Sequence, residues 1–179
     1  RKYFTVVSPK NLLNYVAERK RLLEQSEKDL QEMLPELERM KKKDEGVSVE
    51  VFKGVEGAKT ILNHILQVGE SLRIFPITGA LFELAPVFYR NYLKRKEQAG
   101  IRSYFLASED KRGLYKGVPL TTVRYLPADF NLPSSTWIYS DYVVIFIVVD
   151  GVTIIRVHSR AVAEVYLNFF NSFWNAAKK

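Results

Sequence analysis

Two histidines, His64 and His158, and the absence of cysteine restrict the chemistry that this chain can perform. Nucleophilic catalysis through a serine or a cysteine needs a neighbouring base. His64 lies in "ILNHILQ", at the border of the apolar face of a predicted helix, where a packed histidine is the more common case. His158 lies in "RVHSR", where a predicted strand ends beside a helix cap, and no G-x-S-x-G sequence occurs. We therefore expect no catalytic residues and no enzymatic activity.

Sequence motifs for metal ions and for nucleotide phosphates are absent as well. Neither histidine is paired with another histidine or with a carboxylate at zinc spacing. The stretch "KGVEG" has two glycines, but not at the spacing of a Walker or a dinucleotide-binding loop. The lack of cysteine excludes disulfides and thiolate sites and suits a reducing compartment. The sequence predicts no metal and no cofactor, and it favours a cytoplasmic location.

Several polar residues remain as candidates for binding a ligand. Open α/β sheets bind ligands at the carboxyl ends of parallel strands, close to free helix N-termini. Two such places, at Thr78-Gly79 and at Ser108, follow predicted strands, and Ser140 and Asp141 precede a predicted buried strand. Arg124, like Arg156, is a cation within a strand that could meet an anion or pair with a carboxylate. Ordinary turn chemistry explains the loop positions equally well. The candidates are Thr78, Gly79, Ser108, Arg124, Ser140 and Asp141.

Alternating strands and helices from residue 47 onwards predict the sheet that must position these candidates. Strand patterns occur at 47–52, 71–77 and 101–107, and helical patterns lie between them at 55–68 and 81–98. This order predicts neighbouring parallel strands with right-handed crossovers. Loops are predicted at 108–119 and 127–136, on either side of a strand at 121–126.

The last third of the chain predicts a hairpin and a helix. Two β-rich runs, 137–149 and 152–157, flank Asp150-Gly151, which is a signal for a two-residue hairpin loop. The unalternated "YVVIFIVV" predicts a central strand that is buried on both faces. Ser159 is a good N-cap for a final helix with a broad apolar face. The expected fold is a mixed α/β sheet flanked by helices, with the final helix clamping one face.

Residues 8–45 have the pattern of a long coiled-coil helix. Ser8-Pro9 is a good helix start. Apolar residues seven apart then form a narrow heptad seam among charged residues, with polar residues at two seam positions. We expect a homodimer through this helix, although a helix folded back on its own domain has the same pattern. Pro35 is expected to kink the helix or to end its first part. The predicted dimerisation residues are Leu12, Val16, Leu23, Leu30 and Leu37.

The charge and the apolar runs of the chain limit its partners. A net charge of +7 permits contact with nucleic acid, with a phosphate-bearing ligand or with an anionic membrane, without choosing among them. The longest apolar run, Tyr142 to Val149, ends at Asp150 and is far shorter than the roughly 18 residues of a membrane span. We expect no membrane-spanning segment.

Four stretches resemble the effector half of the TrmB family of archaeal and bacterial transcriptional regulators: "RKYFTVVSPKNLLNYVAERKRLLE", "VEVFKGVEGAKTILNHIL", "RKEQAGIRSYFL" and "LNFFNSFW". The order of elements from Val47 to Trp174 is similar to the phospholipase D-like fold. In that family a winged-helix DNA-binding domain comes first, and a coiled-coil helix joins it to the effector domain. The resemblance implies that residues 1–7 are the end of the wing, 8–45 the dimerisation helix and 46–179 a phospholipase D-like effector domain. It also implies DNA binding through the missing upstream domain and a small effector such as a sugar or an anionic metabolite.

The chain departs from both families at two points. Phospholipase D enzymes carry H-x-K-x-x-x-x-D, whereas His158 is followed by Arg160 and Val165 at the Lys and Asp positions, and His64 by Leu66. Some TrmB members complete a sugar site with a further C-terminal β-rich domain that has no counterpart after Trp174, so sugar binding is not carried over. Our main hypothesis is a non-catalytic effector-sensing and dimerisation part of a TrmB-like regulator. The alternatives are a phospholipase D-like phosphodiesterase or nuclease and a dimerisation scaffold without a ligand.

Overall fold

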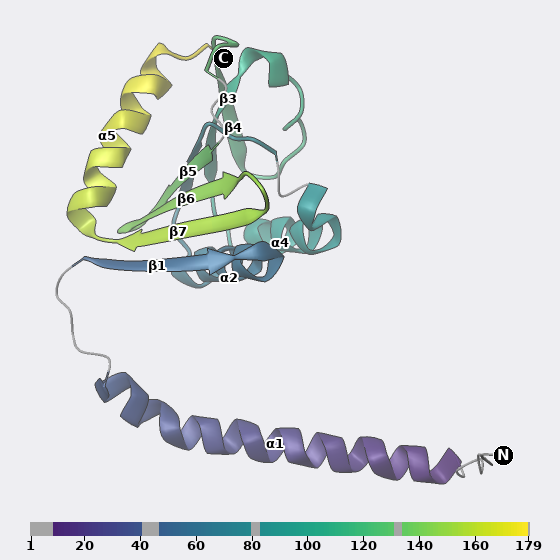
Figure 1. Ribbon diagram of the computed structural model, residues 1–179. Coiled ribbons are helices and arrows are strands. Elements are labelled where there is room, and N and C mark those ends of the chain that lie inside the picture. Colours follow the sequence, from purple (N-terminus) through teal and green to yellow (C-terminus); the bar gives the residue numbers. More distant parts are fainter. Residues whose placement is uncertain (1–8, 41–46, 80–82, 131–133, 179) are drawn as a thin grey trace. The chain divides into compact units, whose positions relative to one another are not determined.

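The computed structural model describes residues 9–40, 47–79, 83–130 and 134–178. The chain forms two units, Arg1–Glu45 and Gly46–Lys179. In the first unit the described residues form one helix, α1 (Pro9–Met40), which begins at Pro9 as predicted and continues past Pro35 (Figure 1). Pro35 therefore does not end the helix. No helix in the described ranges is both long and apolar enough to cross a membrane.

The predicted seam of α1 is exposed on the single chain. The side chains of Leu12, Val16, Leu23 and Leu30 are 63%, 62%, 70% and 59% exposed. Leu37 belongs to the helix, but its side chain lies outside the described residues. Dimerisation through this seam stays a prediction.

The second unit is built on a mixed seven-stranded sheet with the order β1-β7-β6-β5-β2-β3-β4. The neighbours β2-β3 and β3-β4 are parallel, and every other neighbouring pair is antiparallel. The predicted α/β fold with a mixed sheet flanked by helices is confirmed. The strands are β1 (Ser48–Lys53), β2 (Leu72–Phe75), β3 (Ser103–Ser108), β4 (Thr121–Leu126), β5 (Ser134–Tyr139), β6 (Tyr142–Val148) and β7 (Val152–His158).

The position of β1 differs from the prediction. The first strand was expected beside the second, but it lies at the far edge of the sheet and pairs antiparallel with β7. Its outward face carries Val49 and Val51, which are both mostly exposed. A local pattern predicts that a segment is a strand but not which strand it pairs with, and here the paired residues are about 100 positions apart in the sequence.

The predicted strand at 137–149 is wrong, because it is two antiparallel strands. A tight turn at Ser140-Asp141 separates β5 from β6, with Ser140 at φ 47°. The hairpin between β6 and β7 is confirmed, but Val148 pairs with Val152, so its loop has the three residues 149–151 rather than two. Asp150 has φ 52° and Gly151 has φ 119°, which are left-handed values typical of three-residue loops.

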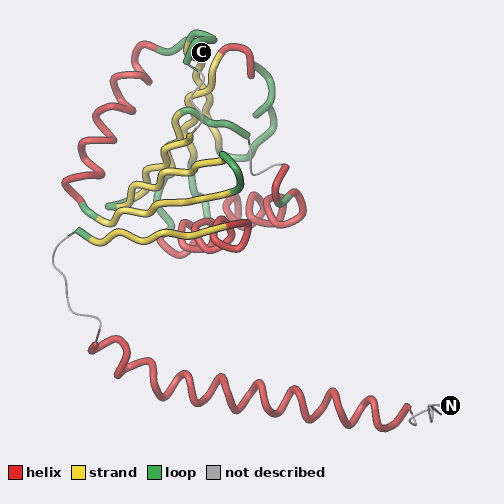
Figure 2. Tube along the Cα trace, viewed as in Figure 1, coloured by secondary structure: helices red, strands yellow, loops and turns green. Residues whose placement is uncertain are grey.

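Helices cover the two faces of the sheet. One face carries α2 (Gly54–Val68) and α4 (Pro86–Gln98), and the other carries α5 (Arg160–Ala176), as Figure 2 shows. Along α2 the buried residues Ala58, Ile61, Leu62 and Ile65 recur at helical spacing, so one side of the helix faces the sheet. Within the predicted helix at 81–98, Glu83 and Leu84 are helical, and α4 begins at Pro86, a good first helical residue.

The final helix begins as predicted. The Ser159 hydroxyl accepts a hydrogen bond from the Val162 N–H at 3.5 Å, and α5 follows directly. Its broad apolar face is only partly covered. Phe170 is buried against Phe75, Leu106, Leu126 and Ile138, whereas other large apolar side chains of the helix remain exposed: Val165, Phe169 and Phe173.

Candidate functional site

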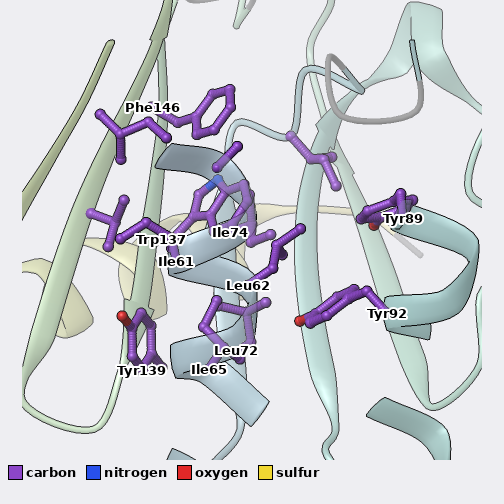
Figure 3. Packing of buried hydrophobic residues seen from close by; sticks show 14 of the residues in the cluster. Ile61, Leu62, Ile65, Leu72, Ile74, Tyr89, Tyr92, Trp137, Tyr139 and Phe146 are labelled. Atoms are coloured by element: carbon purple, nitrogen blue, oxygen red, sulfur yellow. The ribbon is translucent and has the colours of Figure 1, made fainter. Parts of the chain in front are cut away.

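A cavity of about 30 Å³ lies between α2, α4 and the face of the sheet that these helices cover. Its walls are mainly hydrocarbon and aromatic side chains from α2 and from strands β2, β3, β5 and β6. Figure 3 shows several of these side chains packed around Leu62 of α2. The apolar walls include Leu62, Leu72, Ile74, Phe105, Trp137 and Phe146.

The helix α4 contributes Tyr89, Tyr92 and Lys96 to the cavity. Residues at spacings of three, four and seven lie on one side of a helix, so these three side chains face the sheet together. They are the buried residues of α4, and the partly buried Phe88 and Leu93 pack beside them. The rings of Tyr89 and Tyr92 are stacked with centroids 5.8 Å apart. This spacing makes one face of α4 a wall of the cavity.

Tyr92 places a buried hydroxyl at the cavity. Its side chain is 3% exposed, and its oxygen has no hydrogen-bond partner among the described residues. Burial is the main cause that raises the pKa of Tyr92, and the neighbouring phenols of Tyr89 and Tyr139 raise it further. The hydroxyl is therefore protonated at neutral pH and can donate a hydrogen bond.

Lys96 is buried without a carboxylate. Its ammonium group donates to Ser103 Oγ at 2.8 Å, to the Pro119 carbonyl at 2.9 Å and to Thr121 Oγ1 at 3.2 Å. These neutral oxygens use all three of its N–H donors. No ion pair of Lys96 is found within the ranges that the structure describes. Burial lowers the pKa of Lys96 to about 8, with a smaller opposing effect from Glu97.

The rim of the cavity includes two residues that the sequence proposed, Thr78 and Gly79. They follow Ile77, whose N–H donates to the Leu106 carbonyl at 2.9 Å and whose carbonyl accepts from the Tyr115 hydroxyl at 3.2 Å. Gly79 has φ 84°, a left-handed value that favours glycine. These contacts hold the segment after β2 at the mouth of the cavity.

The other proposed residues do not line the cavity, and each has a hydrogen-bond partner elsewhere in the chain. The Ser108 hydroxyl donates to the Asp110 carboxylate. Arg124 donates to the Trp174 carbonyl at 2.6 Å and lies 4.7 Å from the centre of the Trp174 ring. The Ser140 hydroxyl donates to Glu70 at 2.9 Å, and the Asp141 carbonyl accepts from the Ser159 N–H at 2.9 Å. Of the six candidates, the structure brings Thr78 and Gly79 together at the cavity.

Sequence reasoning missed a second group, the histidine cluster, which we define as His64, Tyr139, Tyr142, Arg156 and His158. His64 Nδ1 lies 3.0 Å from the Tyr139 hydroxyl, and the His64 ring meets Tyr142 edge-on at 4.7 Å. The Tyr142 ring also stacks on the His158 ring, with the ring centres 4.3 Å apart. The two histidines therefore lie on the same tyrosine.

Charge surrounds this cluster as well. The Arg156 guanidinium pairs with Glu50, its Nε lying 2.8 Å from the carboxylate, and it sits 5.5 Å from the centre of the Tyr142 ring. Burial lowers the pKa of His64, and the charges of Arg156 and His158 lower it further, against an opposing effect of Glu50. The described residues include no group of three or more His, Asp or Glu side chains able to hold a metal ion.

The histidine cluster could have been predicted from the sequence only with the correct register of the last hairpin. A two-residue loop would pair Val149 with Val152, whereas the observed loop pairs Tyr142 with His158. A shift of one residue moves the side chains of a strand to the other face. Only the three-residue loop therefore places His158 beside Tyr142, on the face of the sheet that is covered by α2, the helix that carries His64.

Solved structures similar to this chain share its fold. TrmBL2, described as an archaeal chromatin protein with a novel mode of DNA binding, is 16% identical, with a TM-score of 0.54, over 97% of this chain and 71% of that chain. Nuc from Salmonella typhimurium, a phospholipase D family member, is 16% identical, with a TM-score of 0.51, over 74% of this chain and 97% of that chain. NucT from Helicobacter pylori is 11% identical, with a TM-score of 0.51, over 74% and 99%. No family model matches the chain, and no curated protein does. The phospholipase D-like fold is thereby confirmed.

The expectation of a chain without enzymatic activity is contradicted by these neighbours. Two of the similar structures are Nuc and NucT, and Nuc is a member of the phospholipase D family. The expectation rested on the missing H-x-K-x-x-x-x-D motif and on treating the two histidines as isolated residues. The fold is one that phospholipase D family members use, and the histidines meet at Tyr142.

Proposed function

We propose that this chain is the effector-sensing and dimerisation part of a TrmB-like DNA-binding transcriptional regulator. The observation that carries the proposal is the extent of the structural matches. The match to TrmBL2 covers 97% of the chain, which is too much to leave out α1, whereas the matches to Nuc and NucT cover 74%. TrmBL2 is described as a DNA-binding chromatin protein. In this proposal, DNA contact belongs to a winged-helix domain outside residues 1–179.

The exposed seam of α1 supports a dimer in this proposal. Leu23 and Leu30 are seven residues apart and are more than half exposed. Covering one such side chain with a partner helix stabilises the pair by about 1.5–3 kcal/mol. Polar seam residues such as Arg19, which donates to the Tyr15 hydroxyl at 3.0 Å, lower the stability of a coiled coil but specify its register. A second copy of α1 is the partner that such a seam fits.

Sedimentation equilibrium on the 179-residue chain tests the dimer. The unmodified chain is expected to be dimeric at micromolar concentration, and Leu23→Lys is expected to weaken the dimer at least about 100-fold, since it places a charge in the seam. Gln31→Lys, which adds the same charge off the seam, is the matched control and is expected to leave the dimer intact. A chain that stays monomeric at the highest attainable concentration contradicts the proposal.

Phosphodiester hydrolysis is a second candidate function, favoured by the likeness to Nuc and by the histidine cluster. Phospholipase D enzymes use a histidine as the nucleophile on phosphorus, and here two histidines lie near the cation Arg156. The test is turnover of bis(4-nitrophenyl) phosphate by the purified chain. Activity that is lost in His158→Ala but kept in His64→Ala assigns the nucleophile to His158, and the reverse result assigns it to His64. A chain without turnover removes this candidate and leaves the regulator proposal unaffected.

A further inference from the structure

The walls of the α2–α4 cavity are unsuited to a sugar. Leu62, Ile74, Phe105 and Trp137 offer no hydrogen-bonding group to the cavity other than the Trp137 indole, and that indole N–H already donates to Ser135 Oγ at 2.9 Å. A sugar carries a hydroxyl on most of its carbons, and each would lose its water without gaining a partner on such a wall. The body of a ligand in this cavity must therefore be apolar.

Three buried hydroxyls of the cavity each keep a hydrogen to donate. The Tyr92 hydroxyl is buried and has no partner among the described residues, and Figure 3 shows it pointing from α4 towards Leu62 and Leu72. Ser103 Oγ accepts a hydrogen bond from Lys96, and Ser135 Oγ accepts one from Trp137, so both keep a hydroxyl hydrogen. Both serines are at most 2% exposed. Unused buried donors at one cavity call for an acceptor from outside the chain.

The positive charge of Lys96 indicates which charge the accepting group of the ligand should carry. Lys96 lies one helical turn after Tyr92, is 1% exposed and has only neutral oxygens as partners. A buried cation without a counter-ion raises the affinity of its surroundings for an anion. The ligand group that accepts from Tyr92 should therefore carry a negative charge.

We infer that the α2–α4 cavity binds a small monocarboxylate, a molecule with one short apolar chain and one carboxylate. The carboxylate accepts hydrogen bonds from Tyr92 and Ser103 and lies in the field of the Lys96 ammonium group, and the chain lies against Leu62 and Trp137. The volume of about 30 Å³ has room for roughly two or three water molecules, so the apolar chain is no longer than the methyl group of acetate. Binding rests on the cavity alone, whereas the identification of this ligand as the effector rests on the proposed function.

A ligand series on the full chain tests the chemical class. Thermal shift and isothermal titration calorimetry compare acetate, propionate, butyrate and hexanoate with the primary alcohols of the same length and with glucose. A ligand that binds only the folded chain raises its melting temperature. Acetate is expected to do so, with butyrate and hexanoate too long for the cavity. Alcohols that bind as tightly as the carboxylates, or a complete absence of carboxylate binding, overturn the inference.

The variant Tyr92→Phe tests the site, because it keeps the ring and removes only the hydroxyl. It is expected to weaken acetate binding about tenfold or more, since hydrogen bonds to charged groups are among the stronger ones. Tyr166→Phe on α5, on the other face of the sheet, is the matched control and is expected to bind acetate as the unmodified chain does. Equal affinity of Tyr92→Phe and the unmodified chain overturns the site.

The outcomes for the ligand and for the proposed function are separable. A chain that binds acetate through Tyr92 but fails to dimerise retains the cavity inference and contradicts the regulator proposal. A chain that dimerises through α1 and binds no carboxylate contradicts the inference and retains the proposal.

Discussion

Two buried tyrosines on the same face of the sheet, Tyr139 and Tyr92, have opposite surroundings. Tyr139 is 0% exposed and Tyr92 is 3% exposed. In Figure 3 they lie on either side of Ile65 and Leu72. The Tyr139 hydroxyl lies 3.0 Å from His64 Nδ1, whereas the Tyr92 hydroxyl has no partner in the described part of the chain. The two tyrosines are thus buried to the same extent, but the Tyr139 hydroxyl has a hydrogen-bond partner and the Tyr92 hydroxyl has none among the described residues.

The cations of the two regions differ in the same way. In the histidine cluster, Arg156 has Glu50 as its ion-pair partner. At the cavity, the partners of Lys96 among the described residues are three neutral acceptors and no carboxylate. A buried polar network that satisfies its members stabilises the fold, whereas an unbalanced one costs stability that a ligand can restore. We therefore place the proposed small ligand at the cavity and not at the histidine cluster.

The largest expected effect concerns Lys96 and alkaline pH. Burial lowers the pKa of Lys96 to about 8 from an ordinary value of 10.5. Below pH 8 the lysine is charged in both the folded and the unfolded chain, so stability does not vary through this group. Between pH 8 and 10 the folded chain releases the proton first, and the free energy of unfolding is expected to rise by about 2 kcal/mol relative to that of Lys96→Met, which has the same tyrosines but no titrating lysine at this position. Urea unfolding at pH 7, 8, 9 and 10 measures the rise.

Buried tyrosines act in the opposite direction in both chains. Burial raises the pKa values of Tyr89, Tyr92, Tyr115 and Tyr139, so from about pH 9 the unfolded chain ionises first and stability falls. Lys96→Met should show this fall alone, and the difference between the two chains isolates the lysine. A difference that stays constant between pH 8 and 10 would show that Lys96 has an anionic partner, and the contrast between the two regions would fail.

The second effect is the loss of stability in Tyr139→Phe. Removing this hydroxyl leaves His64 Nδ1 without its partner at 3.0 Å in a half-buried position. The expected cost is about 1–2 kcal/mol of unfolding free energy, the usual cost of a broken buried hydrogen bond. Chemical denaturation at pH 7.5 measures it. A variant as stable as the unmodified chain would mean that the His64–Tyr139 contact is not a stabilising bond.

The third effect has the opposite sign. Tyr92→Phe removes a buried hydroxyl that has no partner, so the free chain is expected to gain up to about 1 kcal/mol of stability. The same substitution type therefore destabilises one region and stabilises the other. Denaturation of the two variants side by side, without added ligand, is the measurement. A loss of stability in Tyr92→Phe would reveal a partner for this hydroxyl and remove the unsatisfied donor from the cavity.

The elements of the fold could largely be predicted from the sequence because their signals are local. The apolar side of α2, the cap at Ser159 and the hairpin around Asp150-Gly151 are properties of short segments. The pairing of β1 with β7 is not, since any edge of the sheet accepts an alternating strand. The split between β5 and β6 was missed because Ser140-Asp141 lacks the glycine that usually marks a tight turn.

The candidate site was predicted less well than the fold. Thr78 and Gly79 were found from their place after a strand, which is a topological rule. Lys96 was missed because it stands in "YLKRKEQ", among basic residues that read as a solvated helix face. Its position four residues after Tyr92 was the available signal, but only a packed structure separates the buried lysine from its exposed neighbours.

The smallest expected effect is at acid pH and belongs to the histidine cluster. Burial, together with Arg156 and His158, lowers the pKa of His64 below its ordinary value of 6.5, and Glu50 opposes this only in part. Above pH 6.5 His64 is neutral in both states and its contribution to stability is complete. As the pH falls below 6.5 the unfolded chain binds the proton first, so stability is lost.

Unfolding free energies at pH 7.5, 6.5 and 5.5 check this loss, with His64→Gln as the comparison. Glutamine retains a polar group but does not titrate, so the difference in stability between the two chains should shrink on acidification if His64 is responsible. An increase in the relative stability of the unmodified chain at pH 5.5 would mean that His64 is stabilised in its charged form. Glu50 would then outweigh burial, Arg156 and His158, and the neutral state assigned to His64 in the histidine cluster would be wrong.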